Sequence, residues 1–258
     1  MLKIKYIGQC GFIVTSEDNS LRIAFDPVLN DITDSSGNTI RCYPPVIPCE
    51  ELNADYIFCS HDHIDHLAEE TLLQVSKVSP ETKYIVPNGC KEILLNLGIS
   101  EMQIITLSDL EEVTISSRLS VKAFSAAHPV HQLDKNGQDH NLCYAVKMDG
   151  KQLLHPGDTY KTERLMANIR SLGTIDLFFP PINGRDDKRE AEGIIGNLFP
   201  EEACDIVNEA DILNTIPTHF DMIKGNTEDP QRFIAAFRNK GCKGNYFIPS
   251  LDEEITLI

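Results

Sequence analysis

The sequence is poor in positive charge. Its 258 residues include 23 lysine and arginine residues against 39 aspartate and glutamate residues, so the formal net charge is −16. Proteins that bind the phosphate backbone of a nucleic acid present basic patches that neutralise the polyanion. The acidic balance therefore argues against a nucleic-acid partner. A small anionic substrate stays compatible with it, because a bound divalent cation reverses the local field of a site.

Long apolar runs are also absent. No stretch approaches the roughly 20 apolar residues that a membrane-spanning helix needs, so we expect no membrane association. Residues 1–8 alternate like a strand and lack the apolar core of a signal peptide. The eight cysteines are scattered without a Cys-x-x-Cys pair. In a chain without an export signal this pattern favours reduced thiols and a cytoplasmic location.

No repeat, low-complexity tract or linker divides the chain, which predicts a single domain over residues 1–258. Apolar and alternating segments predict strands at residues 2–7, 11–15, 21–25, 56–59, 83–86, 118–125, 142–148, 152–155 and 177–180. Helices are predicted at residues 68–78, 91–97, 162–171, 200–208 and 230–239. Two strand-rich halves interleaved with helices predict an α/β protein with two packed sheets. Residues 27–50 are expected to form a loop that acts as a mobile flap over a site.

The densest group of histidines follows the predicted strand at residues 56–59. Three of the eight histidines fall within His61-Asp62-His63-Ile64-Asp65-His66, and a helical stretch comes next. In such a turn, closely spaced imidazoles and a carboxylate can point into one cavity instead of alternating across a sheet. The plain alternative is a polar turn with solvated histidines, since short motifs also arise without function.

This segment resembles the His-x-His-x-Asp-His signature of the metallo-β-lactamase superfamily. Later segments of that family are matched in order by Ala126-Ala127-His128-Pro129, His155-Pro156-Gly157-Asp158-Thr159 and Ile216-Pro217-Thr218-His219. The resemblance implies a four-layer αββα sandwich. It also implies one metal ion on His61, His63 and His128, a second on Asp65, His66 and His219, and Asp158 shared by both. Alone, His128 and His219 would more often be structural histidines and Asp158 a turn residue, but their joint occurrence favours the metal site.

Imidazole and carboxylate ligands suit zinc, manganese or iron as the cofactor ions. Two divalent ions that share a carboxylate can share a water whose pKa falls toward ~7, which gives a hydroxide for attack on a carbonyl or phosphoryl centre. We therefore expect a metal-dependent hydrolase with Asp65 and Asp158 as catalytic residues. Asp62, inside the motif, is a further catalytic candidate as a proton shuttle or as a partner of a ligand. A plain solvated carboxylate is the alternative there.

Within the superfamily, the chain resembles the branch that contains the bacterial L-ascorbate-6-phosphate lactonase. That resemblance is carried by Gly8-Gln9-Cys10-Gly11-Phe12, Phe25-Asp26-Pro27 and Thr218-His219-Phe220-Asp221, together with the turn before Asp158. It implies hydrolysis of a small-molecule lactone or ester, with or without a phosphate group.

A substrate phosphate would need cationic or N–H contacts. Arg185 is therefore a candidate phosphate clamp, and His155 is a second candidate for substrate binding. Both have plain alternatives. The segment Arg185-Asp186-Asp187-Lys188-Arg189 also fits a solvated charged turn. His155 also fits a hydrogen-bonded histidine at the end of a strand.

Three other functions stay open. A phosphodiesterase, including an RNA-processing nuclease, would use nearly the same ligands, and the acidic charge disfavours the nuclease. A di-iron redox domain is disfavoured by the intact His-x-His-x-Asp-His motif. A non-catalytic metal-binding module is disfavoured by the complete set of ligand residues. A homo-oligomer also stays open, because an acidic surface does not forbid a symmetric assembly.

Overall fold

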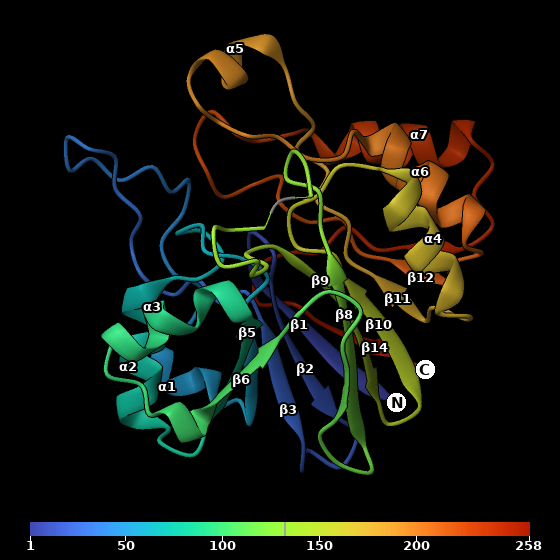
Figure 1. Ribbon diagram of the computed structural model, residues 1–258. Helices are drawn as coiled ribbons and strands as arrows, with labels where there is room; N and C mark the ends of the chain where they lie inside the picture. Colours follow the sequence, from blue (N-terminus) through green and yellow to red (C-terminus); the bar gives the residue numbers. More distant parts are fainter. Residues whose placement is uncertain (132) are drawn as a thin grey trace.

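The computed structural model describes residues 1–131 and 133–258. Two sheets face each other, with strand orders β14-β1-β2-β3-β4-β5-β6 and β13-β12-β11-β10-β9-β8-β7. Helices cover the outer face of each sheet, so the layers run helix, sheet, sheet, helix (Figure 1). This arrangement confirms the αββα sandwich that the sequence predicted.

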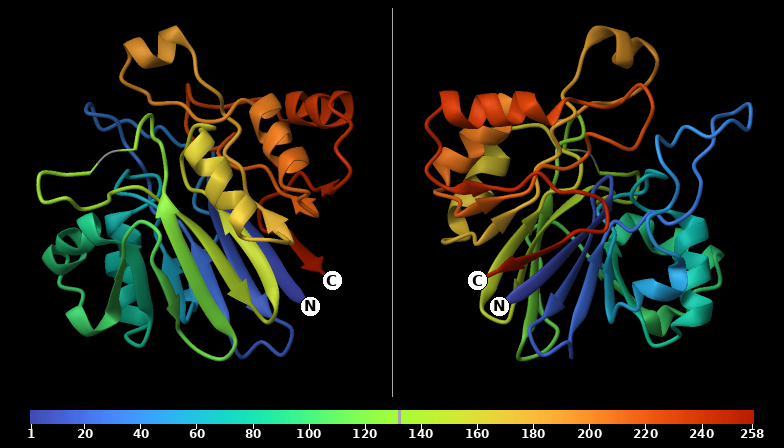
Figure 2. Two further views of the ribbon diagram at one scale, coloured as in Figure 1. Left: turned by 45° about the vertical axis from the view of Figure 1, so that its right-hand side comes forward. Right: turned by 180° about the vertical axis from the view of Figure 1, so that it is seen from behind.

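The strands of the first sheet are β1 (Leu2–Gly8), β2 (Gly11–Ser16), β3 (Arg22–Phe25), β4 (Tyr56–Phe58), β5 (Lys83–Pro87), β6 (Ile104–Leu107) and β14 (Glu254–Leu257). Those of the second are β7 (Glu112–Thr114), β8 (Leu119–Ser125), β9 (Leu142–Met148), β10 (Lys151–His155), β11 (Leu177–Phe178), β12 (Asn214–Thr215) and β13 (Asn245–Tyr246). Helices α1 (Cys49–Leu52), α2 (Glu69–Val78) and α3 (Lys91–Asn96) lie beside the first sheet, and α4 (Glu163–Ser171), α6 (Pro200–Glu209) and α7 (Pro230–Asn239) beside the second (Figure 2). Helix α5 (Asp187–Ala191) lies on a projecting loop, and the 3-10 turns η1 (Asn88–Cys90) and η2 (Glu101–Gln103) flank α3.

Strand alternation explains how the second sheet is buried on both faces. On β9, Leu142, Tyr144 and Val146 belong to the core between the sheets, whereas Cys143 and Ala145 belong to the core shared with the helices. Successive side chains of a strand point to opposite faces, so one apolar strand supplies both cores.

All the predicted strands and helices are present, with ends within two residues of the prediction. The elements that the sequence did not reveal are β6, β7, β12, β13, β14, α1, α5 and the two 3-10 turns, each two to five residues long. Segments of that length carry too little periodicity to stand out from loops. None of the helices in the described residues has the length and apolarity to traverse a bilayer.

The topology gathers loops at one edge of the sandwich. Strands β3 to β6 run parallel to one another, as do β10 to β13. The carboxyl ends of parallel strands meet at the same edge of a sheet, where loops can carry binding residues. Helix α5 and the loop at residues 27–48 project at this edge, above the strands in Figure 1.

Candidate metal centre

Seven candidate ligands converge at this edge of the sandwich. The turn after β4 supplies His61, His63, Asp65 and His66, and the segments after β8, β10 and β12 supply His128, Asp158 and His219. The ligand atoms of His61, His63, His128 and Asp158 lie within 4.8 Å of one another, and those of Asp65, His66 and His219 do so as well. The structure thus brings together all seven residues that the sequence singled out. We call His61, His63 and His128 the three-histidine group, and Asp65, His66 and His219 the Asp65 group.

Asp158 lies between the two groups. Its Oδ1 is 3.2 Å from His66 Nε2, and its Oδ2 is 3.2 Å from His219 Nε2. The same Oδ2 is 3.7 Å from His128 Nε2. One carboxylate therefore faces both groups, which is the position that a shared ligand requires.

Several buried polar atoms of the site have no hydrogen-bond partner among the described residues. They are His61 Nε2, both ring nitrogens of His128, and the pair His66 Nε2 and Asp158 Oδ1, which lie 3.2 Å apart without hydrogen-bond geometry. A buried polar atom left unpaired costs roughly 1–3 kcal/mol, so native proteins rarely keep several side by side. Imidazole nitrogens and carboxylate oxygens are ligands for divalent first-row ions. The donor set therefore fits metal ions.

Asp26 positions the imidazoles, and sequence reasoning did not select it as a site residue. His66 Nδ1–H donates to Asp26 Oδ2 over 2.7 Å, and the Ser60 hydroxyl donates to the same oxygen over 2.7 Å. His61 Nδ1–H in turn donates to Ser60 Oγ over 3.0 Å. These bonds leave Nε2 of both rings directed to the site, as partners of metal-ligating histidines do. The available signal was a carboxylate directly after a predicted apolar strand, in the segment Phe25-Asp26-Pro27.

Gln9 is a second residue of the site that was missed. It is fully buried in the turn between β1 and β2. Its side-chain Nε2 donates to Asp65 Oδ2 over 2.6 Å and lies 2.9 Å from His219 Nε2. Its backbone carbonyl accepts from the His219 N–H over 2.9 Å. Gln9 therefore holds two members of the Asp65 group in place.

Cys10 also lies beside the site, although no cysteine was expected among the ligands. Its Sγ is within 4.8 Å of ligand atoms of His66 and Asp158. Burial, and then the charge of Asp158, raise the pKa of the Cys10 thiol well above its ordinary value. The neutral thiol donates to Thr218 Oγ1 over 3.5 Å, so it borders the site as a packing residue.

The backbone around the site is strained. Gln9, Asp26 and His219 have φ values of +56°, +37° and +57°, in the left-handed region that costs a residue other than glycine of order 1–3 kcal/mol. Such residues concentrate at functional sites. Gly157 has a φ of +58°, and a Cβ there would lie 2.5 Å from Ser60 Cβ, so only glycine permits the turn that presents Asp158.

The two groups differ in their protonation. Burial lowers the pKa of His128 to about 4, and burial followed by the charge of His66 lowers that of His61 well below its usual value. Burial also opposes charge on His219, but the carboxylates, led by Asp158, outweigh it and raise its pKa to about 9. They likewise raise the pKa of His66 well above normal. Without a cation, His66 and His219 therefore keep protons that His61 and His128 do not.

A cleft of about 430 Å³ opens above the two groups. Asp65, Asp158, His63 and His219 all line it. Asp62 lines it too, and its Oδ2 accepts from His140 Nδ1–H over 3.0 Å. The structure therefore places Asp62 beside the cleft, as a proton shuttle requires, and pairs it with His140 outside the two ligand groups.

The structure does not bring His155 to the cleft. Its ring is 1% exposed and stacks on Phe25 at a centroid distance of 4.8 Å. Its Nε2–H donates to the Cys10 carbonyl over 3.0 Å, and its Nδ1 accepts from the Gly157 N–H over 3.3 Å. Both nitrogens are thus occupied by backbone, so we assign His155 to support of the turn before Asp158 and not to substrate contact.

Arg185 is not at the cleft either. Its guanidinium forms a bidentate pair with Glu202 over 2.7 and 2.8 Å and donates to the Asn197 carbonyl over 2.8 Å. It lies between the rings of Tyr160 and Phe199, 4.4 and 4.3 Å from their centroids. These contacts engage both terminal nitrogens away from the cleft, so they favour a structural role over the expected phosphate clamp.

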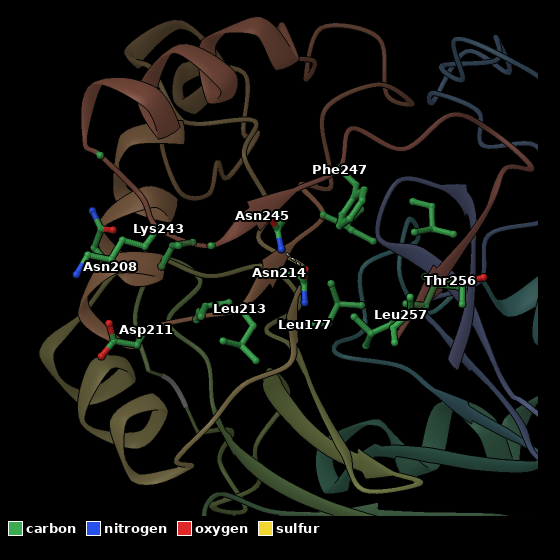
Figure 3. Close-up of a pocket in the computed structure, with 18 residues that line it drawn as sticks. Leu177, Asn208, Asp211, Leu213, Asn214, Lys243, Asn245, Phe247, Thr256 and Leu257 are labelled. Atoms are coloured by element: carbon green, nitrogen blue, oxygen red, sulfur yellow. Dashed lines mark hydrogen bonds between the residues drawn. The ribbon is translucent and has the colours of Figure 1, made fainter. Parts of the chain in front are cut away.

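A larger groove of about 860 Å³ opens between β13 and β14 (Figure 3). Leu213, Phe247 and Leu257 contribute apolar surface to it, and Asn245 Nδ2 donates to Asn214 Oδ1 across one wall over 3.1 Å. Its lining contains no histidine or cysteine among the described residues. Despite its size, this groove lacks the groups that metal chemistry needs.

Comparison with known proteins agrees with the geometry. The family described as the beta-lactamase superfamily domain matches residues 21–220. The UPF0173 metal-dependent hydrolase of Thermococcus onnurineus is 25% identical over 242 residues, which are 90% of this chain and 91% of that protein. The N-acyl-phosphatidylethanolamine-hydrolyzing phospholipase D 1 of Caenorhabditis elegans is 26% identical over 227 residues, which are 83% of this chain and 62% of that protein.

Among solved structures, Igni18, a metallo hydrolase from Ignicoccus hospitalis, superposes with a TM-score of 0.72. The two chains are 19% identical, and the match covers 98% of this chain and 97% of Igni18, so it shows a shared fold. The resemblance to the ascorbate-phosphate lactonase branch stays a prediction. Because the family match spans most of the sequence and the fold agrees with it, the chain belongs to the β-lactamase superfamily and is a metal-dependent hydrolase of the metallo-β-lactamase fold.

Proposed function

We propose that the protein hydrolyses a small carboxylic ester or lactone with divalent cations held by the three-histidine group, the Asp65 group and Asp158. The observation that carries this proposal is the convergence of seven ligand-type side chains around buried nitrogens that have no partner among the described residues. Zinc, manganese or iron ions bound there would lower the pKa of water toward ~7 and polarise the substrate carbonyl.

The reaction adds water across the acyl C–O bond. The oxygen of water bonds to the carbonyl carbon, the bond to the alkoxy oxygen breaks, and a proton passes to that leaving oxygen. Asp65 takes this proton from water and returns it, since its carboxylate is only partly buried and lines the cleft. Gln9 fixes the orientation of that carboxylate through its 2.6 Å hydrogen bond.

Asp62 and His140 then exchange the remaining proton with solvent. The Asp62 carboxylate faces the cleft and is 36% exposed, and its partner His140 is 31% exposed. A hydrogen-bonded carboxylate and imidazole at the rim form a short route along which a proton leaves the acid product. Both residues act on protons and need not contact the metal ions.

A phosphodiesterase is the second candidate. The Caenorhabditis elegans relative is named as a phospholipase D, and an enzyme of that type cleaves a phosphodiester. A ligand set of this kind also suits a phosphoryl centre, because cations can stabilise both the attacking and the leaving oxygen. The net charge of −16 disfavours RNA as the phosphodiester.

The test is a hydrolysis panel on protein loaded with zinc, manganese or iron after chelator treatment. The panel contains lactones, carboxylic esters and phosphodiesters, and bound metal is measured by elemental analysis in parallel. We expect turnover of lactones or esters that chelator abolishes and metal restores. Turnover of phosphodiesters alone would select the second candidate. Full metal loading without turnover of any class would reject both.

A further inference from the structure

The cleft above the metal-binding groups has walls made largely of isoleucine. Six isoleucines line it, from segments far apart in the chain: Ile32, Ile40, Ile64, Ile194, Ile195 and Ile223. The cleft volume of about 430 Å³ lies in the range of small-molecule sites. Ile64 and Ile195 are 58% and 36% exposed, so the apolar surface faces open space.

One wall is a hairpin that we call the flap hairpin, residues 32–40. The Ile40 N–H donates to the Ile32 carbonyl over 2.9 Å, and Thr33 and Thr39 form an antiparallel bridge beyond them. Ile40 is joined in turn to the segment after His219, because its carbonyl accepts from the Lys224 N–H over 2.8 Å. Backbone pairing therefore sets Ile32 and Ile40 side by side, with Ile223 on the adjoining segment.

The opposite wall follows α5. The Ile194 N–H donates to the Arg189 carbonyl over 2.9 Å, which closes the turn that carries Ile194 and Ile195. The Arg189 guanidinium is committed to the Asn183 carbonyl and to Asn226 Oδ1, over 2.8 and 2.9 Å. This arginine therefore anchors the wall and does not face a substrate.

The charge of the cleft has one sign apart from its histidines. Among the described residues, those that line it include no lysine or arginine, whereas Asp62, Asp65 and Asp158 all contribute carboxylates. The nearby Arg41 does not line the cleft: its Nε and Nη1 donate to the carbonyls of Tyr43, Val28 and Asn30, and its Nη2 is buried without a partner among the described residues. A substrate phosphate held in the cleft away from the cations would meet mainly isoleucine side chains and the Asp62 carboxylate, with Asn226 as a neutral polar neighbour. It would therefore lack the cationic donors that a buried anion needs.

We propose that this isoleucine-lined cleft is a subsite for an aliphatic group, and that the protein prefers neutral esters or lactones with an aliphatic acyl chain over phosphorylated ones. The proposal rests on the proposed function and names its substrate class. Each methylene moved from water into an apolar cleft favours binding by about 0.8 kcal/mol, which is about fourfold in kcat/KM. Chain length should therefore raise turnover until the cleft is filled.

The experiment compares acetyl, butyryl, hexanoyl and octanoyl esters of p-nitrophenol, and lactones of matching length, on metal-loaded protein. A sugar lactone and its phosphorylated counterpart complete the series. We expect kcat/KM to rise at least about tenfold from acetyl to octanoyl, and the phosphorylated lactone to be the poorer of its pair. Binding of octanoate and of butyrate is measured by calorimetry as a readout that needs no turnover.

Ile195→Asp tests the wall itself, because it places a carboxylate among the isoleucines at a partly exposed position. It should cut the octanoyl-to-acetyl ratio by about fivefold or more, and Ile195→Leu should keep the ratio. The matched control is Leu213→Asp, at a residue that is 45% exposed in the separate groove of Figure 3. Thermal unfolding of each variant reports whether it is folded.

The outcomes separate the subsite from the chemistry. Ester turnover that is independent of chain length, or equal loss in the Ile195→Asp and Leu213→Asp variants, would overturn the subsite and leave the hydrolase standing. Preference for the phosphorylated lactone would overturn it as well. Tighter binding of octanoate than of butyrate by protein that hydrolyses no ester or lactone would support the subsite and reject the proposed function alone.

Discussion

The two ligand groups of the metal centre are close neighbours with opposite electrostatic character. In the three-histidine group, burial keeps the pKa of His128 at about 4, so neutral nitrogens are ready for a cation. In the Asp65 group, carboxylates raise the pKa of His219 to about 9, so a cation must displace a proton. The comparison teaches that the number of nearby carboxylates sets the pKa of a buried histidine. With few carboxylates the imidazole is neutral and can bind a cation at once, and with more of them it carries a proton that the cation must displace.

Removal of the residue that serves both groups should have the largest effect. Asp158→Ala deletes the carboxylate that faces His66, His219 and His128, so the protein should lose most bound metal and at least about a hundredfold of kcat/KM. Elemental analysis after dialysis and ester hydrolysis check this. Glu112→Ala, on the exposed edge strand β7, is the control. A variant that keeps full metal content and activity would contradict the bridging position.

A change behind the Asp65 group should separate the two groups. Asp26→Asn removes the charge that His66 Nδ1–H meets at 2.7 Å, and partners of this kind are worth about 10–100-fold in metal affinity. The metal equivalent held by the Asp65 group should weaken more than the one held by the three-histidine group, because Asp26 contacts His66 directly and His61 only through Ser60. Metal titration with a competing chelator measures both. Asp176→Asn, at a carboxylate paired with Lys151, is the matched control. Equal weakening of both metal equivalents would contradict the direct role of Asp26 at the Asp65 group.

The pH dependence should sharpen the contrast further. A pKa of His219 raised from 6.5 to about 9 stabilises the metal-free fold below pH 6.5, and this contribution is lost as the pH rises through about 9. Over the same window, metal affinity at the Asp65 group should rise up to about tenfold per pH unit as His219 loses its proton, whereas the low pKa of His128 adds no such dependence above about pH 5. Calorimetry in buffers of different ionisation enthalpy counts the protons released, and the absence of proton release near neutral pH would contradict the raised pKa.

The smallest effect on the centre is expected from Arg185→Ala. The guanidinium pairs with Glu202 and stacks on two rings, so its loss should lower stability by about 1 kcal/mol. Metal content and the preference between phosphorylated and neutral substrates should not change. Denaturant unfolding and the substrate panel check this. A selective rise in KM for the phosphorylated substrates would restore the phosphate clamp.

The metal-binding residues could be predicted because their signal is local or ordered. His61 to His66 fall within one turn after an apolar strand, and the later candidates each follow a strand. The supporting residues could not be found this way. Gln9 reaches the site only because the turn after β1 lies against the segment after β12. Asp26 reaches it only because β3 pairs with β4.

The apolar lining of the cleft was hidden from the sequence for a related reason. The sequence predicted a flap over a site at residues 27–50, but it did not indicate that Ile32 would meet Ile195, far away in the chain, across one cleft. The basic cluster around Arg185 predicted a substrate contact, but in the fold the Arg185 guanidinium donates to Glu202 and to the Asn197 carbonyl. A local charge pattern cannot report which partners the fold will supply.

The left-handed backbone at Gln9, Asp26 and His219 implies that side-chain contacts hold a conformation which the backbone alone would not favour. Glycine at position 9 would relax the φ of +56°, but it would also empty the space of a fully buried side chain and delete the donor to Asp65. Relief of the strain and loss of these contacts therefore oppose each other, so the turn keeps its shape through the residues of the site that it supports.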